Sequence, residues 1–242
     1  MLILPATPNV ITGFLDAAEA APKELSTIAN ITLAPPMPFI PEDAHGDPIL
    51  IGQLAYVGPV ERAATVLAPF RALAKPYTDM VRPLRYPQLY DGPEQAARFA
   101  SGANFFADAL PPGGAEAILE ALPRSTAMMR AVQLRVLGGA IARVPNDTTA
   151  FAHRDRGLFV NIAAMYAHRA EQATHDAWVN GIADALGKDE AGGYVGFLGD
   201  EDESTIRAAY PGQTWDRLRK LKGRYDPDNL FRLNHNIPPS KP

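Results

Sequence analysis

The sequence predicts an α+β fold in which an antiparallel sheet of about six or seven strands carries helices on one face. Two observations support this prediction. Segments rich in β-branched residues recur along the chain with alternating polarity, and several come as antiparallel-looking pairs. Between the pairs lie segments with apolar residues at helical spacing. The other face of such a sheet is free to meet a ligand or another domain.

The N-terminal elements follow from local signals. Thr7 is a capping hydroxyl followed by Pro8, and the apolar spacing after it predicts a helix that ends near Pro22. Two β-rich runs, at 27–32 and 48–57, have strand character and could pair as a long hairpin.

The later elements alternate in type. Gly58 and Pro59 open a helix that Pro76 ends, and the Pro-, Tyr- and Arg-rich stretch 81–104 is expected to be a long loop or lid. The remaining predicted elements are a helix over 114–122, strands over 131–137 and 158–163, and a helix over 171–186.

Composition excludes several classes of function. The chain has 242 residues and no cysteine, which rules out disulfides, thiolate metal sites and a cysteinyl cofactor link. A net charge of −4 with scattered basic residues argues against a nucleic-acid partner. No apolar run is long enough to span a membrane, so we expect a soluble, cytoplasmic protein without a membrane partner. The five histidines are spread along the chain and are expected at the surface, with no metal site.

The C-terminal segment carries the most specific pattern. No G-x-G-x-x-G, G-x-x-x-x-G-K-[ST], G-x-S-x-G or H-E-x-x-H motif occurs. The run LKGRYDPDNLFRLNHNIPP, at 221–239, combines a basic helix end, a D-P-D-N turn and the apolar pair Leu230 and Phe231, so it indicates a docked tail. It also resembles the closing segment of berberine-bridge-type flavoproteins, K-x-x-Y-D-P-x-N-x-F-R-x-N-x-x-I.

The resemblance extends upstream over essentially the whole chain. GYVGFLGD at 193–200 looks like the Y-x-N strand of that family, and the segments 2–8, 134–140 and 151–154 are similar to bacterial members. It implies a substrate-binding domain over 1–192 and a C-terminal segment over 193–242 that in intact members joins the flavin domain. The flavin-binding domain that precedes this part in family members is absent, so FAD is implied as cofactor but is not expected to be retained by this chain alone.

The resemblance also implies site residues. Tyr194 matches the tyrosine that takes a proton as hydride leaves for the flavin, whereas its residue type alone is equally typical of a strand aromatic that covers the core. Such a phenol, with an ordinary pKa of about 10, needs a cation or second hydroxyl beside it to act as a base. Gly196 stands where the family usually has Asn. Asn234 and Asn236 resemble positions that contact the flavin region, and Asp226 and Asn229 are expected to build the turn.

Alternation supplies the substrate-facing candidates. Gln133 and Arg135 are two residues apart in a predicted strand, so both point to the same face, which is either the substrate-facing side or a solvated polar surface. Asn161 and Tyr166 are further candidates whose facing the sequence leaves open.

Two functions are compatible with these features. The first is the substrate-binding half of an FAD-dependent oxidase or dehydrogenase that removes hydride from a small organic molecule, and it would act only with a flavin domain. The alternative is a non-catalytic stand-alone relic that forms a homodimer or binds a ligand through the open sheet face. Gly196 favours this alternative.

Overall fold

A seven-stranded antiparallel sheet organises the computed structural model, which describes residues 1–90, 99–187, 192–199 and 203–240. The strand order is β4-β1-β3-β2-β6-β7-β5. Each neighbouring pair runs antiparallel, which confirms the predicted fold class. The strands are β1 (Leu2–Pro5), β2 (Leu25–Leu33), β3 (Pro48–Tyr56), β4 (Thr78–Asp79), β5 (Phe99–Ala107), β6 (Met129–Val136) and β7 (Leu158–Tyr166).

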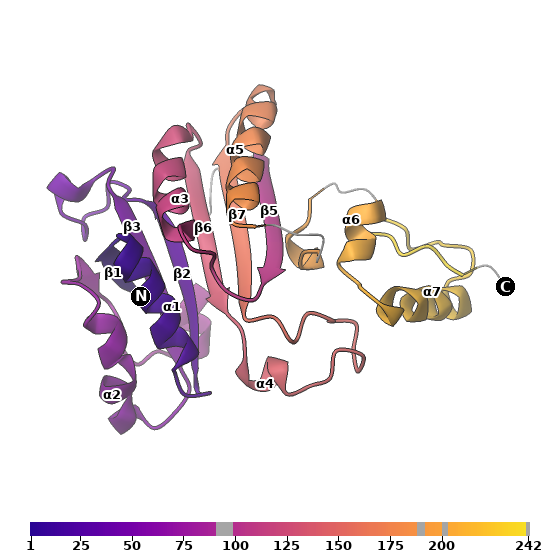
Figure 1. Cartoon of the computed structure of the whole chain (residues 1–242), viewed down its shortest axis with the longest axis horizontal. Coiled ribbons are helices and arrows are strands. Elements are labelled where there is room, and N and C mark those ends of the chain that lie inside the picture. The colour runs from indigo at the N-terminus through magenta and orange to yellow at the C-terminus, as the bar shows by residue number, and fades with distance from the viewer. Residues whose placement is uncertain (91–98, 188–191, 200–202, 241–242) are drawn as a thin grey trace.

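Helices gather on one side of this sheet (Figure 1), where α1, α3 and α5 lie across the strands. The helices are α1 (Pro8–Glu19), α2 (Val60–Arg71), α3 (Gly114–Ala121), α4 (Gly139–Ala142), α5 (Gln172–Ala185), α6 (Glu203–Ala208) and α7 (Gln213–Tyr225). None of the described helices has the length and apolar character needed to cross a membrane.

The main core lies between these helices and the sheet. Phe14 of α1 meets Phe70 of α2 edge to face at 5.0 Å between ring centroids, and both rings are buried. Ile31, Leu50 and Val132 are buried in the same cluster. Alternate residues of each strand thus point toward the helices, and the residues between them point to the opposite side.

That opposite side is partly covered at the β1–β3 end. The connection between β2 and β3 brings Ala34, Ile40 and Ala44 over Ile3 and Ile49, and the five form a second buried cluster. The helix-free side is therefore narrower than the sequence suggested. We call its remaining part, on β2, β6, β7 and β5, the open face.

Two predicted features are wrong. Residues 99–104, expected in a long loop, belong to β5, which pairs with β7 over its full length. The segment FASGAN lacks alternation because small residues occupy both sides, so the pairing with β7 decides its conformation. The stretch 91–98 of the expected loop lies outside the described residues. The expected strand at 193–200 is instead an extended approach to a 3₁₀ turn, Val195–Phe197.

The C-terminal segment lies beside the β5 edge, off the sheet (Figure 1), and the chain beyond α7 turns back along it. Asp226 builds the turn as expected, because its carboxylate accepts the amides of Leu230 and Phe231 at 2.7 and 3.0 Å. Leu230 and Phe231 do not anchor the tail to this chain, however. They are 76% and 79% exposed, and Leu233 is 86% exposed. We call these three residues the apolar strip.

The start of α1 provides a test of the fold. The Thr7 hydroxyl accepts the amide of Val10 at 3.3 Å, as predicted for the capping residue. Thr7→Ala should lower the free energy of unfolding by about 1 kcal/mol in urea denaturation. Thr12→Ala is the matched control, because this exposed hydroxyl only returns to the Pro8 carbonyl of its own helix. Equal losses in both variants would contradict the capping role.

Candidate functional site

A row of amide side chains crosses the open face. Four strands each contribute one residue in direct register: Asn30 of β2 opposite Gln133 of β6, Gln133 opposite Asn161 of β7, and Asn161 opposite Asn104 of β5. Their flanking residues point into the core on the helix side, which turns the amides outward. We call these four residues the polar row.

Hydrogen bonds fix one half of the polar row. Gln133 donates its Nε2 to Asn30 Oδ1 at 2.8 Å. Arg135, two residues along β6, donates Nε and Nη2 to Gln133 Oε1 at 2.8 and 2.5 Å. The orientation of the Gln133 amide is thereby set from both ends, and the guanidinium is held in one place.

Aromatic rings lie beside this network. The guanidinium carbon of Arg135 is 5.8 Å from the ring centroid of Phe159 and 5.2 Å from that of Phe197. Phe159 is buried in β7 next to the polar row, and Phe197 follows in the 3₁₀ turn of the C-terminal segment. Burial lowers the pKa of Arg135 from its ordinary value, and the group stays charged near neutrality.

Tyr194 joins the site from the C-terminal segment. Its ring centroid lies 6.4 Å from that of Phe159 and 5.9 Å from that of Phe197, and the side chain is 43% exposed. It belongs to no strand, so the interpretation as a strand aromatic that covers the core does not fit its position. Tyr210 lies close enough for charge on Tyr194 to raise its pKa, although burial contributes more to that rise.

Asn104 fastens Tyr194 to the sheet. Its Oδ1 accepts the backbone amide of Tyr194 at 2.6 Å, and the residue is 4% exposed. Gly193 permits this approach, since a Cβ there would stand 2.5 Å from Asn104 Oδ1 and 2.7 Å from the Asn104 carbonyl oxygen. Asn104 Nδ2 is buried without a hydrogen-bond partner in the described structure. The sequence reasoning missed Asn104 because it assigned the segment to a loop.

The predicted substrate-facing residues divide between two faces. Gln133, Arg135 and Asn161 lie on the open face, as alternation from their buried neighbours requires. Tyr166 does not join them. It is 2% exposed on the helix side, where its hydroxyl meets Ser101 Oγ at 3.1 Å and its ring stacks on His175 at 4.5 Å. Residues five apart in one strand face opposite ways, so Tyr166 is excluded from the site.

The two tail asparagines stand apart from the polar row. Asn234 is exposed and has a positive φ of 58°, and Asn236 donates its amide to the Asn234 carbonyl at 3.0 Å. Between them, His235 Nε2 hydrogen-bonds the Gly199 carbonyl at 2.9 Å, which ties the tail to the stretch after Tyr194. Asn236 Oδ1 is buried, and no donor reaches it from the described residues.

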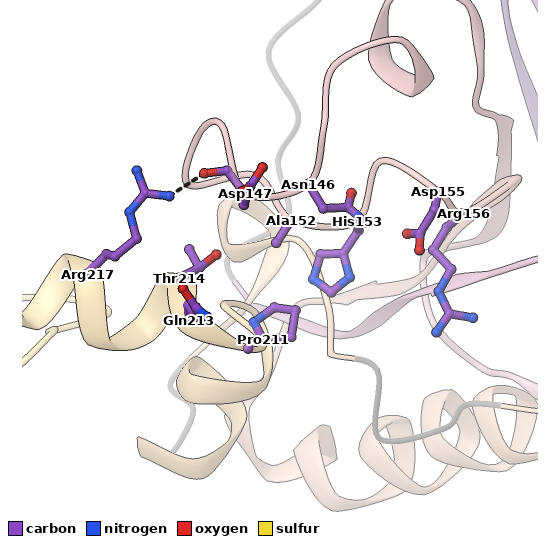
Figure 2. Close-up of a pocket in the computed structure, with 11 residues that line it drawn as sticks. Asn146, Asp147, Ala152, His153, Asp155, Arg156, Pro211, Gln213, Thr214 and Arg217 are labelled. Carbon is purple, nitrogen blue, oxygen red and sulfur yellow. Dashed lines mark hydrogen bonds between the residues drawn. The ribbon is translucent and has the colours of Figure 1, made fainter.

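A separate groove of about 430 Å³ lies between the β6–β7 connection and the start of α7 (Figure 2). Asp147 and Asp155 face it with Arg156 and Arg217, and the Arg217 guanidinium donates to the Asp147 carbonyl across it. Because charges of both signs line it, we interpret the groove as the seam where the C-terminal segment meets the rest of the chain.

His153 closes the inner end of that seam. It is 4% exposed, its ring stacks on Phe106 of β5 at 4.3 Å, and its Nε2 lies 3.2 Å from the Ala209 carbonyl. His175 is 1% exposed, so the expectation that the histidines lie at the surface is wrong for both residues. Within the described ranges, no group of three or more acidic, His or Cys side chains could hold a metal.

Comparison with known proteins adds a family to this geometry. Residues 193–238 match the family described as "Berberine and berberine like". An uncharacterized FAD-linked oxidoreductase of Bacillus subtilis is 28% identical over 189 residues, which are 76% of this chain and 42% of that protein.

Solved structures share the fold. A berberine-bridge-enzyme-like protein of Physcomitrella patens superposes with a TM-score of 0.74 at 17% identity, over 100% of this chain and 54% of that one. A chitooligosaccharide oxidase gives a TM-score of 0.69 at 16% identity, over 98% of this chain and 53% of that one. The chain thus spans about half the length of these proteins.

The bond from Asn104 to Tyr194 predicts a local effect. In Asn104→Ala, hydrogen exchange of the Tyr194 amide should become about tenfold faster, because the loss of a buried acceptor frees that amide. NMR of the ¹⁵N-labelled chain measures this single amide. Asn161→Ala is the matched control from the same row, since its side chain does not bond Tyr194. An unchanged exchange rate in Asn104→Ala would show that other contacts hold Tyr194.

Proposed function

Because the chain belongs to the berberine and berberine-like family of FAD-linked oxidoreductases, we propose that it is the substrate-binding part of an FAD-dependent oxidase or dehydrogenase. The reaction removes hydride from a carbon that bears oxygen or nitrogen in a small organic molecule. We propose residues 1–192 as the substrate-binding domain and 193–242 as the segment that joins a flavin domain. The observation that carries the proposal is the exposed Tyr194 ring fastened beside the polar row.

The open face suits a flat ring with polar edges. Gln133 and Asn161 offer amide donors and acceptors from the sheet, and the buried, unpartnered Asn236 Oδ1 is an acceptor in the tail. These groups fit one edge of an isoalloxazine or a small substrate, and we propose Asn234 and Asn236 as the residues that face the cofactor. The sequence lacks the glycine-rich motif that receives a pyrophosphate. FAD, held by another domain, would supply the acceptor for hydride.

The role proposed for Tyr194 is that of the base. Its phenolate oxygen takes the proton from the substrate hydroxyl or amine while the C–H bond breaks, which leaves a carbonyl or imine. Tyr210 supports this role, since burial and the charge on Tyr194 raise its pKa and keep its hydroxyl protonated when Tyr194 ionises. Gln133, Arg135 and Asn161 orient the substrate from the floor of the face.

A second candidate function is a non-catalytic chain that pairs with a second copy or binds a ligand through the open face. Gly196 favours it, because an amide side chain is missing beside Tyr194. The exposed apolar strip also favours association with another polypeptide. A reading frame next to this one, or codons upstream, that encodes a flavin-binding domain would discriminate in favour of the enzyme.

The catalytic role of Tyr194 is tested in a protein that includes a flavin domain. Tyr194→Phe should slow reduction of the flavin by substrate about 10²- to 10⁴-fold in stopped-flow absorbance, because the base is lost while the ring remains. Substrate affinity should change little. Tyr225→Phe is the control, since this tail phenol is 72% exposed and lies outside the site. Unchanged flavin reduction in Tyr194→Phe would remove the tyrosine from the chemistry.

The need for another domain is tested with the chain alone. Purified from cells, it should be colourless and bind FAD with a dissociation constant of about 1 mM at best, because two or three hydrogen bonds to one ring edge do not offset the cost of association. Absorbance at the flavin maximum after gel filtration measures retention. Stoichiometric flavin in that peak would contradict a chain that relies on another domain for its cofactor.

A further inference from the structure

Arg135 occupies an unusual environment for a cation in this chain. Elsewhere in the described structure, Arg71, Arg124, Arg156 and Lys222 each have a carboxylate within 4.0 Å. Arg135 has no such partner among the described residues, although it is more buried than the exposed Arg124. Its hydrogen bonds go to the neutral Gln133 amide.

A partly buried charge without a counter-charge costs free energy that a ligand can return. The neutral relay from Asn30 through Gln133 fixes the guanidinium without cancelling its charge. Nη1 has no acceptor in the described part of the chain, and it is absent from the buried atoms that lack a partner, so it reaches solvent. The Nη1–Nη2 end of the fork is therefore open to a carboxylate.

The surroundings of Arg135 define the rest of the ligand. Phe197 and Tyr194 are 38% and 43% exposed, and both rings lean on Phe159, which is buried beneath them. Exposed ring faces favour a flat apolar body, which packs on them in offset or edge-to-face contact. Cation and rings thus stand together on the open face, beside the proposed base.

We propose that the open face takes a planar aromatic substrate with a carboxylate, which Arg135 binds while the ring packs against Tyr194 and Phe197. This inference rests on the proposed function for the position of the reacting carbon, but the binding itself needs no flavin. An anionic group on a flat ring could also come from a reduced flavin, so the test separates substrate from cofactor.

The experiment measures binding to the flavin-free chain by ¹⁵N NMR titration. The probes are 4-(hydroxymethyl)benzoate and the neutral 1,4-benzenedimethanol, which share one ring and one alcohol. The carboxylate should bind about tenfold more tightly, and the preference should shrink as sodium chloride is added. Neutral lumiflavin serves as the flat cofactor probe. Equal affinity for the two alcohols, or tighter binding of lumiflavin than of the carboxylate, would overturn the proposal.

Variants assign the preference to Arg135. Arg135→Met, which keeps the apolar stem, should abolish the preference, and Arg135→Lys should retain part of it. Arg124→Met changes the net charge equally at an exposed site and should leave the preference intact. A preference that survives in a folded Arg135→Met would overturn the assignment. If Arg135→Met does not fold, the lysine variant and the salt dependence of the unaltered chain decide the question.

The outcomes separate the two proposals. A carboxylate preference that depends on Arg135, together with unchanged flavin reduction in Tyr194→Phe, would leave the anion site and remove the base. Loss of the preference with a slow Tyr194→Phe variant would keep the oxidoreductase and reject an acidic substrate.

Discussion

The antiparallel pairing of β6 between β2 and β7 is the constraint on which the site depends. It joins the four strands β4, β1, β3 and β2 to the pair β7 and β5. It also sets the register that places Gln133 between Asn30 and Asn161. A slip of one residue in β6 would turn Gln133 and Arg135 into the core and bring Val132 and Leu134 to water. The burial of those two apolar residues therefore fixes where the amides and the guanidinium stand.

Two distant parts of the chain build the open face together. The sheet supplies its polar floor, and the C-terminal segment supplies the Tyr194 and Phe197 rings above Phe159. Asn104 and the seam around His153 hold that segment on the β5 edge. The rings keep a defined place because their backbone is bonded at several points, although no strand contains them. This division suits the proposed function, in which another domain faces the same surface.

How far the site follows from sequence depends on local periodicity. Gln133 and Arg135 could be assigned to one face because they share a strand whose neighbours are apolar. Asn161 and Tyr166 differ in parity, but the predicted strand stopped at 163, so the argument was not extended to Tyr166. Asn104 could not be found, since β5 has no pattern of its own and takes its conformation from β7. The family resemblance indicated Tyr194, whereas its 3₁₀ neighbourhood depends on contacts with Asn104 and Phe159 that no local pattern encodes.

The apolar strip has a consequence for handling the chain. Leu230, Phe231 and Leu233 leave three large side chains in water over four positions, at the tip of a tail that Lys222 and Asp226 keep in shape. Such a patch is sticky toward chromatography resins, dyes and chaperones, and sulfate or phosphate in a buffer strengthens that attraction. Its geometry is fixed by the turn, so the surface presents one shape, and a covering polypeptide would find its binding partner already folded.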